Sequence, residues 1–317
     1  MWPFNKRSTE FQSWPVVRTR PTQKTYGKSI SAFINNMQCH LTTVDVYSDG
    51  AVDAWGFLDL PLFKKKLQRR WVVPSPKDDE QVISVFNFGM TGFRCGEWWQ
   101  TPASILKEVE SSIKSLNPSM TGLIDMEGSD TVSEGKIRRA KMGLSDKKPY
   151  RRDTAKNTDV LASPFPILRV RPSSFELTQL FLFSDGEVQV GPSGEFFSLD
   201  QIQSKYNRGE IANSAPEGSR VVIPGLGTFE TTHRFGGVTI EDRVLELKDK
   251  LSEMNGQKSV VALCAIAFRD YEASPSTEKK ELLRSLYERV PTHLRCYCGD
   301  MDTRDSGIRK IIHGENP

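Results

Sequence analysis

The sequence lacks an excess of charge of either sign. Its 317 residues include 43 Lys and Arg against 40 Asp and Glu, so the formal net charge at pH 7 is only +3. Proteins that bind nucleic acids usually show a clear basic excess or a basic stripe. The charge balance therefore argues against a nucleic-acid partner. The length suits two domains, and the 37% of hydrophobic residues is typical of globular proteins.

The sequence also lacks a disulfide framework and a long apolar run. Its five cysteines are scattered, at positions 39, 95, 264, 296 and 298, and reduced thiols in a cytoplasm fit this pattern. The first residues show no apolar run of the signal-peptide type. The longest apolar stretch, SVVALCAIAF from Ser259, is about half of what a bilayer span needs. We expect a cytoplasmic protein with no membrane partner, and a buried helix at this stretch.

Recognisable catalytic motifs are missing as well. The nucleophile pattern G-x-S-x-G does not occur, and the four histidines stand in unrelated contexts. The tripeptide Gly27-Lys28-Ser29 lacks the first glycine of a phosphate loop, because Thr22 occupies that position. We interpret it as the start of a helix over SISAFINNM, residues 29–37. We therefore predict no catalytic residue and no cofactor, and we favour a protein that is not an enzyme.

One segment near the C-terminus gathers potential metal ligands. HLRCYCGDMDTRDSG holds His293, two cysteines, Asp300, Asp302 and Asp305 within thirteen positions. An EF-hand loop needs Asn or Asp where Arg304 stands, and zinc usually takes a second, separated pair of ligands. The other interpretation is a strand LRCYC, a tight turn, and aspartates that cap the helix SGIRKII. The three aspartates and His293 are the metal candidates, and a metal-dependent hydrolase or nuclease is the alternative function.

What the sequence does contain is a repeat. VYSDGAV begins at Val46, and LFSDGEV begins at Leu182. Both Asp-Gly pairs lie between alternating apolar residues, which predicts two β-hairpins with type I′ turns. Glycine adopts the positive φ of such a turn without strain, and aspartate tolerates it.

The two halves continue in parallel after these hairpins. Each half shows a short helical pattern, two strands and an amphipathic helix, and the long helices begin after Thr101 and Thr239 as the N-cap rules require. We predict an α+β fold: a tandem repeat of a small module (β-hairpin, short helix, two strands, long helix) plus a helical C-terminal segment. The expected boundaries are an N-terminal arm 1–40, module A 41–117, a polar linker 118–160, module B 161–257 and the helical C-terminal segment 258–317.

Two features could contact a partner. The basic run KKKLQRR could bind phosphates, but the balanced charge favours a solvated helix face. The adjacent Trp98 and Trp99 suit an interface anchor, and the other interpretation is that one of them belongs to the core. We name Trp98, Trp99, Lys64, Arg69 and Arg70 as interaction candidates for a protein partner.

The second half of the chain resembles known proteins. RSLYERVPTHLRCYCGDMDTRDSGIRKIIHG, and FSDGEV with RVVIPGLGTF, are similar to uncharacterised bacterial proteins that are grouped with immunity and defence genes. The resemblance covers about half of the chain and implies a bacterial source and a binding role. Because a duplicated module offers a paired surface, we expect a non-enzymatic intracellular binding protein, an immunity- or defence-type factor that engages a protein partner.

Overall fold

The structure, a computed structural model, describes residues 10–20, 23–77, 81–125, 146–299 and 304–314. The chain divides into two compact units. The sheet unit comprises Met1–Phe183, Val188–Phe196 and Gly209–Gly237, and the helical unit comprises Ser184–Glu187, Phe197–Arg208 and Val238–Pro317. No described helix combines the length and the apolar composition that a bilayer crossing requires.

The chain repeats one order of elements, which confirms the predicted α+β tandem repeat. The first repeat contains β1 (Ser13–Arg20), β2 (Gln23–Asn36), β3 (Gln38–Tyr47), β4 (Val52–Asp53), β5 (Phe57–Leu58), α1 (Leu60–Gln68), β6 (Val72–Val73), β7 (Val82–Val85), β8 (Gly89–Trp98) and α2 (Pro102–Leu116). The second repeat contains β9 (Asp146–Asp153), β10 (Thr158–Arg171), β11 (Ser174–Phe183), β12 (Glu187–Val190), β13 (Phe196–Ser198), η1 (Leu199–Gln201) with α4 (Ile202–Asn207), β14 (Ile211–Ala212), β15 (Arg220–Ile223), β16 (Gly227–Thr231) and α5 (Ile240–Met254).

The C-terminal segment is helical, as predicted. Its elements are α6 (Val260–Ala273), α7 (Thr277–Arg289), η2 (Thr292–Tyr297) and α8 (Ser306–His313). The side chains of Ser259 and Ser276 cap α6 and α7 by accepting a backbone N–H of the first turn. Cys264 of α6, Leu283 and Tyr287 of α7 and two isoleucines of α8 are buried in one apolar cluster, which makes this segment a small bundle of its own.

The two Ser-Asp-Gly hairpins form where they were predicted, with a different turn. Gly50 and Gly186 have φ of 80° and 88°, whereas neither Asp49 nor Asp185 has a positive φ. The N–H of Tyr47 donates to the carbonyl of Ala51, and β11 ends at Phe183 while β12 begins at Glu187. Each loop therefore has three residues with glycine at the left-handed position, and the turn is not type I′. Each aspartate instead accepts the backbone N–H two residues on, at 3.2 and 3.3 Å. The aspartate side chain therefore stabilises the turn by this hydrogen bond.

The helix predicted over residues 29–37 is wrong, because these residues belong to β2 apart from Met37. Ile30 and Ile34 face one apolar cluster and Phe33 faces another, and all three are fully buried. A strand that is buried on both faces loses the alternation of polar and apolar residues. Its pattern of apolar residues is therefore the same as that of a short buried helix, and periodicity does not distinguish the two.

Three other local predictions also change. The polar segment 118–160, expected to be mostly irregular, contains β9 and the beginning of β10. The segment LRCYC, which one of the two interpretations took as a strand, lies in the 3-10 helix η2 except for Cys298, which follows it. Likewise β1, all of β2 and the first residues of β3 lie in residues 1–40, so the repeating unit includes a first strand that precedes the long hairpin in each half.

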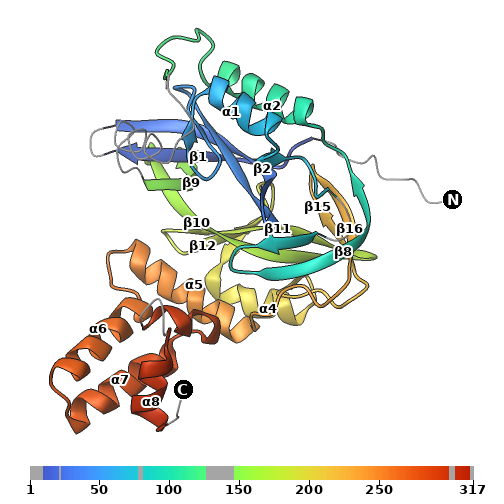
Figure 1. Ribbon diagram of the computed structural model, residues 1–317. Coiled ribbons are helices and arrows are strands. Elements are labelled where there is room, and N and C mark those ends of the chain that lie inside the picture. Colours follow the sequence, from blue (N-terminus) through green and yellow to red (C-terminus); the bar gives the residue numbers. More distant parts are fainter. Residues whose placement is uncertain (1–9, 21–22, 78–80, 126–145, 300–303, 315–317) are drawn as a thin grey trace. The chain divides into compact units, whose positions relative to one another are not determined.

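The strands of both repeats close into a single sheet. Following the pairings from β11 gives the order β11, β15, β16, β8, β7, β3, β2, β1, β9 and β10, and β10 pairs again with β11. Equivalent strands meet at the two places where the repeats join, β1 with β9 and β8 with β16, and both junctions are antiparallel. Figure 1 shows these junctions at opposite sides of the sheet. This is the arrangement that a local two-fold relation between the repeats produces.

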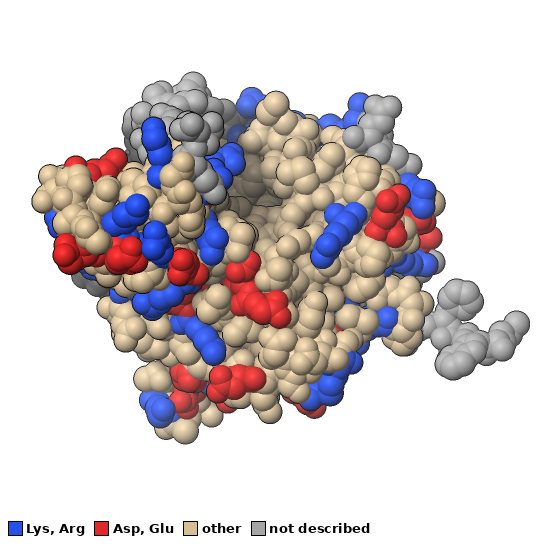
Figure 2. Space-filling view, turned by 90° about the horizontal axis from the view of Figure 1, so that it is seen from below, with Lys and Arg blue, Asp and Glu red and all other residues tan. Residues whose placement is uncertain are grey.

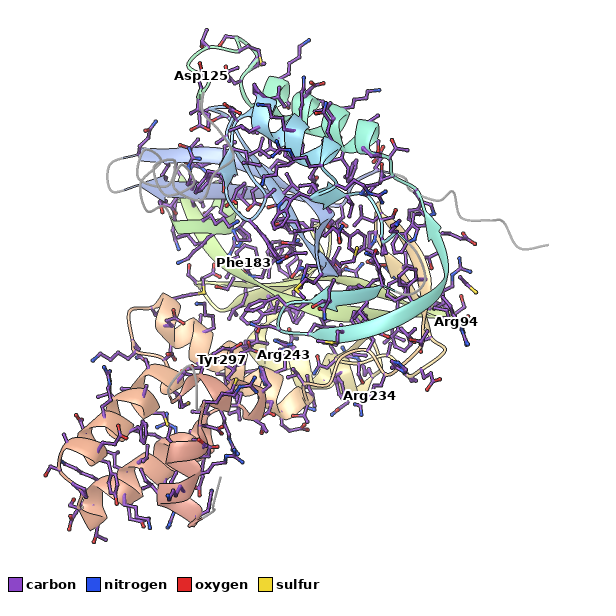
Figure 3. The ribbon with its side chains drawn as sticks, in the orientation of Figure 1. Arg94, Asp125, Phe183, Arg234, Arg243 and Tyr297 are labelled. Atoms are coloured by element: carbon purple, nitrogen blue, oxygen red, sulfur yellow. The ribbon has the colours of Figure 1, made fainter. Side chains whose placement is uncertain are left out.

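An ion pair and packed aromatic rings join β8 and β16 at their junction. On the outer edge, Arg94 (labelled in Figure 3) forms an ion pair with Glu230 of the opposite strand. On the inner side, the rings of Phe93 and Phe229 lie 6.2 Å apart, edge to face. Apolar side chains from both repeats, including Phe33 and Phe235, complete this cluster. The core of the sheet unit therefore needs residues from both repeats.

Helices α1 and α2 lie together over the first repeat (Figure 1). Asp59 caps α1 by accepting the N–H of Leu62 at 2.9 Å, and Thr101 and Ser104 form a reciprocal capping box at the start of α2. The buried faces of the two helices, with Phe63 and Ile105, pack on the core that contains Ile30 and Val46. These contacts fix the two helices on the strands.

Candidate binding site

The structure describes half of the predicted metal cluster. Asp300 and Asp302 lie outside the described residues. Asp305 precedes α8, and its carboxylate accepts the hydroxyl of Tyr287 at 2.5 Å. Burial, together with this hydrogen bond, raises the pKa of Tyr287. The same carboxylate lies 3.7 Å from Nε of Arg309 in α8, so the described side-chain contacts of Asp305 link α7 to α8.

His293 faces a different helix. Its Nε2 donates to Oε2 of Glu246 at 3.1 Å, and the same oxygen accepts Nη1 of Arg243 at 2.5 Å. Arg243 and Glu246 both belong to α5 (Arg243 is labelled in Figure 3) and are almost fully buried. Burial lowers the pKa of Arg243, although Glu246 opposes that shift. Within the described residues, no group of three or more His, Cys, Asp and Glu side chains is placed to hold a metal ion.

The two predicted anchor tryptophans lie where β8 ends. The Trp98 ring stacks on Phe229 at 6.2 Å and meets Phe33 edge to face at 5.5 Å. The backbone N–H of Trp99 donates to the carbonyl of Leu226 at 2.9 Å. Both side chains are half-buried. Their described contacts are with the β8–β16 junction.

The basic run KKKLQRR leads to a groove on the first repeat, which we call the α1–α2 groove. Its volume is about 570 Å³, and it is lined by Lys64, Leu67 and Gln68 of α1, by Arg70, Val72, Val73, Pro74 and Ser75 after it, and by Pro102, Ala103 and Leu106 of α2. Apolar side chains therefore form most of its lining, and Lys64 and Arg70 stand at its polar margin. Lys64 is paired with Glu110 of α2 at 2.9 Å.

Arg70 has an uncommon backbone conformation. Its φ is 58°, and its N–H donates to Leu67 while the next N–H donates to Lys66, at 3.1 and 2.9 Å. These two bonds form the helix C-terminal motif that normally takes glycine at this position. The second repeat does have glycine there, Gly209 with φ 69°, as the sequence predicted. The first repeat thus keeps an exposed arginine in a conformation that costs about 1 kcal/mol for a residue with a Cβ.

An aromatic ladder continues from this turn. The Lys66 ammonium lies 5.1 Å from the centre of the Trp71 ring, and Trp71 is 6.2 Å from Trp55. The Trp55 ring in turn lies 5.0 Å from His40 and is 46% exposed. Tryptophan and arginine are the residue types that most often carry the free energy of binding at protein interfaces. The surface next to the α1–α2 groove is therefore suited to contact a partner.

The sequence analysis missed a group of charged side chains, which we call the charge cluster: Arg18, Asp45, Asp49, Asp53 and Lys147. Lys147 of β9 reaches Asp45 and Asp53 of the first repeat at 3.0 and 2.8 Å, and these carboxylates are only 4% and 9% exposed. Arg18 is 1% exposed and pairs with Asp49. The signal was present, because Asp45 and Asp53 alternate with the apolar residues that predicted the hairpin and so share the opposite face.

The pKa of Lys147 reflects these neighbours. Burial alone lowers it, but the fields of Asp45 and Asp53, and the hydrogen bonds to them, raise it above its ordinary value. Lys147 therefore stays charged and joins the first strand of the second repeat to the hairpin of the first. The charge cluster belongs to the closure of the sheet.

Comparison with known families agrees with the duplication seen in the structure. A family model described as "Domain of unknown function (DUF7638)" matches residues 15–120 and again residues 151–258. A second model, "Domain of unknown function (DUF7639)", matches residues 259–317. The chain belongs to the DUF7638 family, with two copies of its domain. No curated protein and no solved structure matches the chain.

Proposed function

We propose that this is a non-enzymatic binding protein whose α1–α2 groove receives a protein partner. The observation that carries the proposal is Arg70, an exposed arginine at the groove margin in a backbone conformation that glycine takes in the other repeat. Strained positions persist where the surrounding structure or a function requires the side chain. A guanidinium at the margin of an apolar groove is a suitable contact for a partner carboxylate.

The chemistry of the groove defines the partner segment. Leu67, Val72 and Leu106 offer an apolar floor, on which burial of a partner's apolar side chain is favourable. The margin carries Lys64 and Arg70, and Lys65 and Lys66 are neighbouring residues of α1 outside the lining. The partner segment that fits is therefore an apolar stretch with flanking Asp or Glu, such as one face of an acidic amphipathic helix.

A protein partner is preferred to a nucleic acid on grounds of charge. The face in Figure 2, which is turned away from α1 and α2, shows basic and acidic side chains interspersed, with no extended area of one sign. The basic residues around the groove are few, and its lining is mostly apolar. Such a lining supports contact with apolar side chains more than with a phosphate backbone.

The resemblance to bacterial immunity and defence proteins adds a biological role to the proposed binding. A cytoplasmic immunity- or defence-type factor of a bacterium would use such a groove to hold one segment of a toxin or effector. The alternative of a metal-dependent hydrolase has no observation in its favour among the described residues, because His293 and Asp305 each contact another side chain.

Selection of peptides tests the proposal. A displayed library of random helical peptides is selected on the full chain and then counter-selected on Ala103→Trp, which fills the groove from an exposed position of α2. Ser111→Trp, at another exposed position of α2 outside the groove, is the matched control. We expect apolar peptides flanked by acidic residues, with affinity reduced at least about tenfold by Ala103→Trp and unchanged by Ser111→Trp. Peptides that bind both variants equally, or a selection that yields none, would refute the proposed groove.

A further inference from the structure

The two repeats place different side chains at equivalent positions beside the β1–β9 junction. In the first repeat, Asp45 of β3 lies opposite Asp53 of β4. The corresponding pair in the second repeat, counted from the Ser-Asp-Gly turn, is Phe181 opposite Gln189. Two carboxylates of the first repeat are thus replaced by a ring and an amide.

The strands that meet at the junction show the same contrast. Arg18 of β1 and Arg151 of β9 are equivalent by strand register. In each repeat, the last residue of the third strand (β3 or β11) pairs with a residue of the second strand (β2 or β10). The arginine of the first strand pairs with the residue two positions before that one. Four residues before these arginines stand Trp14 and Lys147. The lysine of one strand is therefore a tryptophan in its counterpart.

The arginines keep one contact in both repeats. The guanidinium of Arg18 lies 4.6 Å from the ring centre of Tyr47 and 5.3 Å from that of Phe57. The guanidinium of Arg151 lies 5.1 and 5.2 Å from the rings of Phe183 and Phe196. Each repeat thus has the same frame, an arginine packed over two aromatic rings, while the residues beside that frame differ between the repeats.

In the first repeat the space beside this frame is occupied by the Lys147 ammonium, at 3.0 and 2.8 Å from its two carboxylates. In the second repeat Trp14 packs edge to face on Phe181 at 5.4 Å. Next to this pair lies a cavity of about 300 Å³, which we call the aromatic cavity. Trp14, Arg151, Phe181, Phe183, Gln189 and Phe196 are among its lining residues.

We propose that the aromatic cavity binds a small planar aromatic anion. Rings form much of its wall, and aromatic ligands pack on such walls by stacked and edge contacts. The described lining contains no carboxylate, and its cations are Arg151 and Arg152, of which Arg152 is also paired with Asp159 at 2.7 Å. The volume is at the small end of the usual range for ligand sites, about 300 to 1,000 Å³, so the ligand has one or two fused rings with a carboxylate, sulfonate or phosphate.

Comparison of the two repeats supports a negative charge on this ligand. Relative to the first repeat, the substitution of Trp14, Phe181 and Gln189 for a lysine and two aspartates removes two negative charges and one positive charge. The arginine is kept, so the second position becomes more favourable for an anion than the first. A cation such as a methylated ammonium would meet guanidinium groups at the wall and is disfavoured by the same argument.

Calorimetric titration of the full chain with 1-naphthoate tests the proposal. Three analogues separate its parts: 1-naphthalenemethanol lacks the charge, 1-naphthylmethylammonium reverses it, and cyclohexanecarboxylate lacks the aromatic rings. We expect measurable binding of 1-naphthoate that is at least about fivefold tighter than that of any analogue. Absence of binding by 1-naphthoate, or equal binding by the ammonium analogue, would overturn the assignment.

Two variants locate the bound probe. Phe196→Ala removes a ring that is 46% exposed, so the chain should keep its fold. Phe57→Ala removes the ring that lies over the equivalent arginine of the first repeat. We expect Phe196→Ala to weaken 1-naphthoate at least about fivefold, and Phe57→Ala to leave affinity within about twofold. Equal losses in the two variants, or no loss in Phe196→Ala, would place the probe elsewhere and contradict the proposal.

Discussion

The two repeats have the same order of helices and strands, and they differ in the side chains beside the strand junctions and after the short helix. Both have a 14-residue strand, a 10-residue strand and a 15-residue helix in the same order. Yet the first repeat has a buried ion network where the second has rings and a cavity, and an arginine where the second has Gly209. Alternation of apolar residues and the turn chemistry therefore specify the path of the chain, while positions at the junctions can acquire separate roles.

The largest expected difference between the repeats concerns the equivalent arginines. Arg18→Ala removes a fully buried guanidinium and leaves Asp49 without that partner, so we expect the free energy of unfolding to fall by about 3 kcal/mol. Arg151→Ala removes a half-buried guanidinium, with an expected loss of about 1 kcal/mol. Urea unfolding followed by tryptophan fluorescence measures both, because all six tryptophans lie in the first 99 residues.

A larger loss in Arg151→Ala than in Arg18→Ala would reverse the comparison. It would mean that the ion network of the first repeat contributes less to the closed sheet than the arginine and rings of the second.

A second expected effect depends on pH. Asp159 accepts hydrogen bonds from Lys24, Tyr26 and Arg152 at 2.7, 3.0 and 2.7 Å. Burial raises its pKa, but these three hydrogen bonds outweigh burial and lower the pKa from 3.8 to about 2. Because the folded pKa lies below the unfolded one, the carboxylate contributes stability above about pH 4, and this is lost as the pH falls toward about 2.

Asp159→Asn tests that effect. The variant should be less stable than the parent chain at pH 6 by about 1 to 2 kcal/mol, and the difference should disappear near pH 2. Urea unfolding at a series of pH values measures it. A stability difference that stays constant over this range would show that the ionised carboxylate is not responsible.

The smallest expected effect compares the two helix ends. Arg70→Gly relieves the left-handed conformation and should raise the free energy of unfolding by about 0.5 kcal/mol. Gly209→Ala introduces the same strain, with nothing within 4 Å of the added Cβ, and should lower it by about 1 kcal/mol. The same urea experiment measures both. If Arg70→Gly is instead destabilising, the arginine is retained for the fold, and the argument for binding at the α1–α2 groove loses its basis.

The sequence predicted the repeat because its signals are local. The Ser-Asp-Gly turns, the N-caps of α2 and α5, and the glycine after α4 each need only a few neighbouring residues. Strand β2 was taken for a helix because Ile30, Phe33 and Ile34 are covered on both faces, and that covering depends on distant parts of the chain.

The closed sheet and the sites beside it could not be found in this way. Strand β9 is polar and carries Lys147 and Arg151, whose charges are accommodated only by residues of other strands. Lys64 and Arg70 were named from the basic run, but the apolar floor between them is assembled from α1, β6 and α2. The aromatic cavity joins Trp14 to Phe181 and Phe196, residues that no local pattern connects.

Amide-to-amide nuclear Overhauser effects in the deuterated protein test the central claim, one sheet closed by both repeats. We predict cross-strand contacts that join residues 16–19 to 146–149 and residues 93–98 to 227–231. If contacts occur only between strands of the same repeat, with none across either junction, the two repeats form separate sheets and the closed sheet is contradicted.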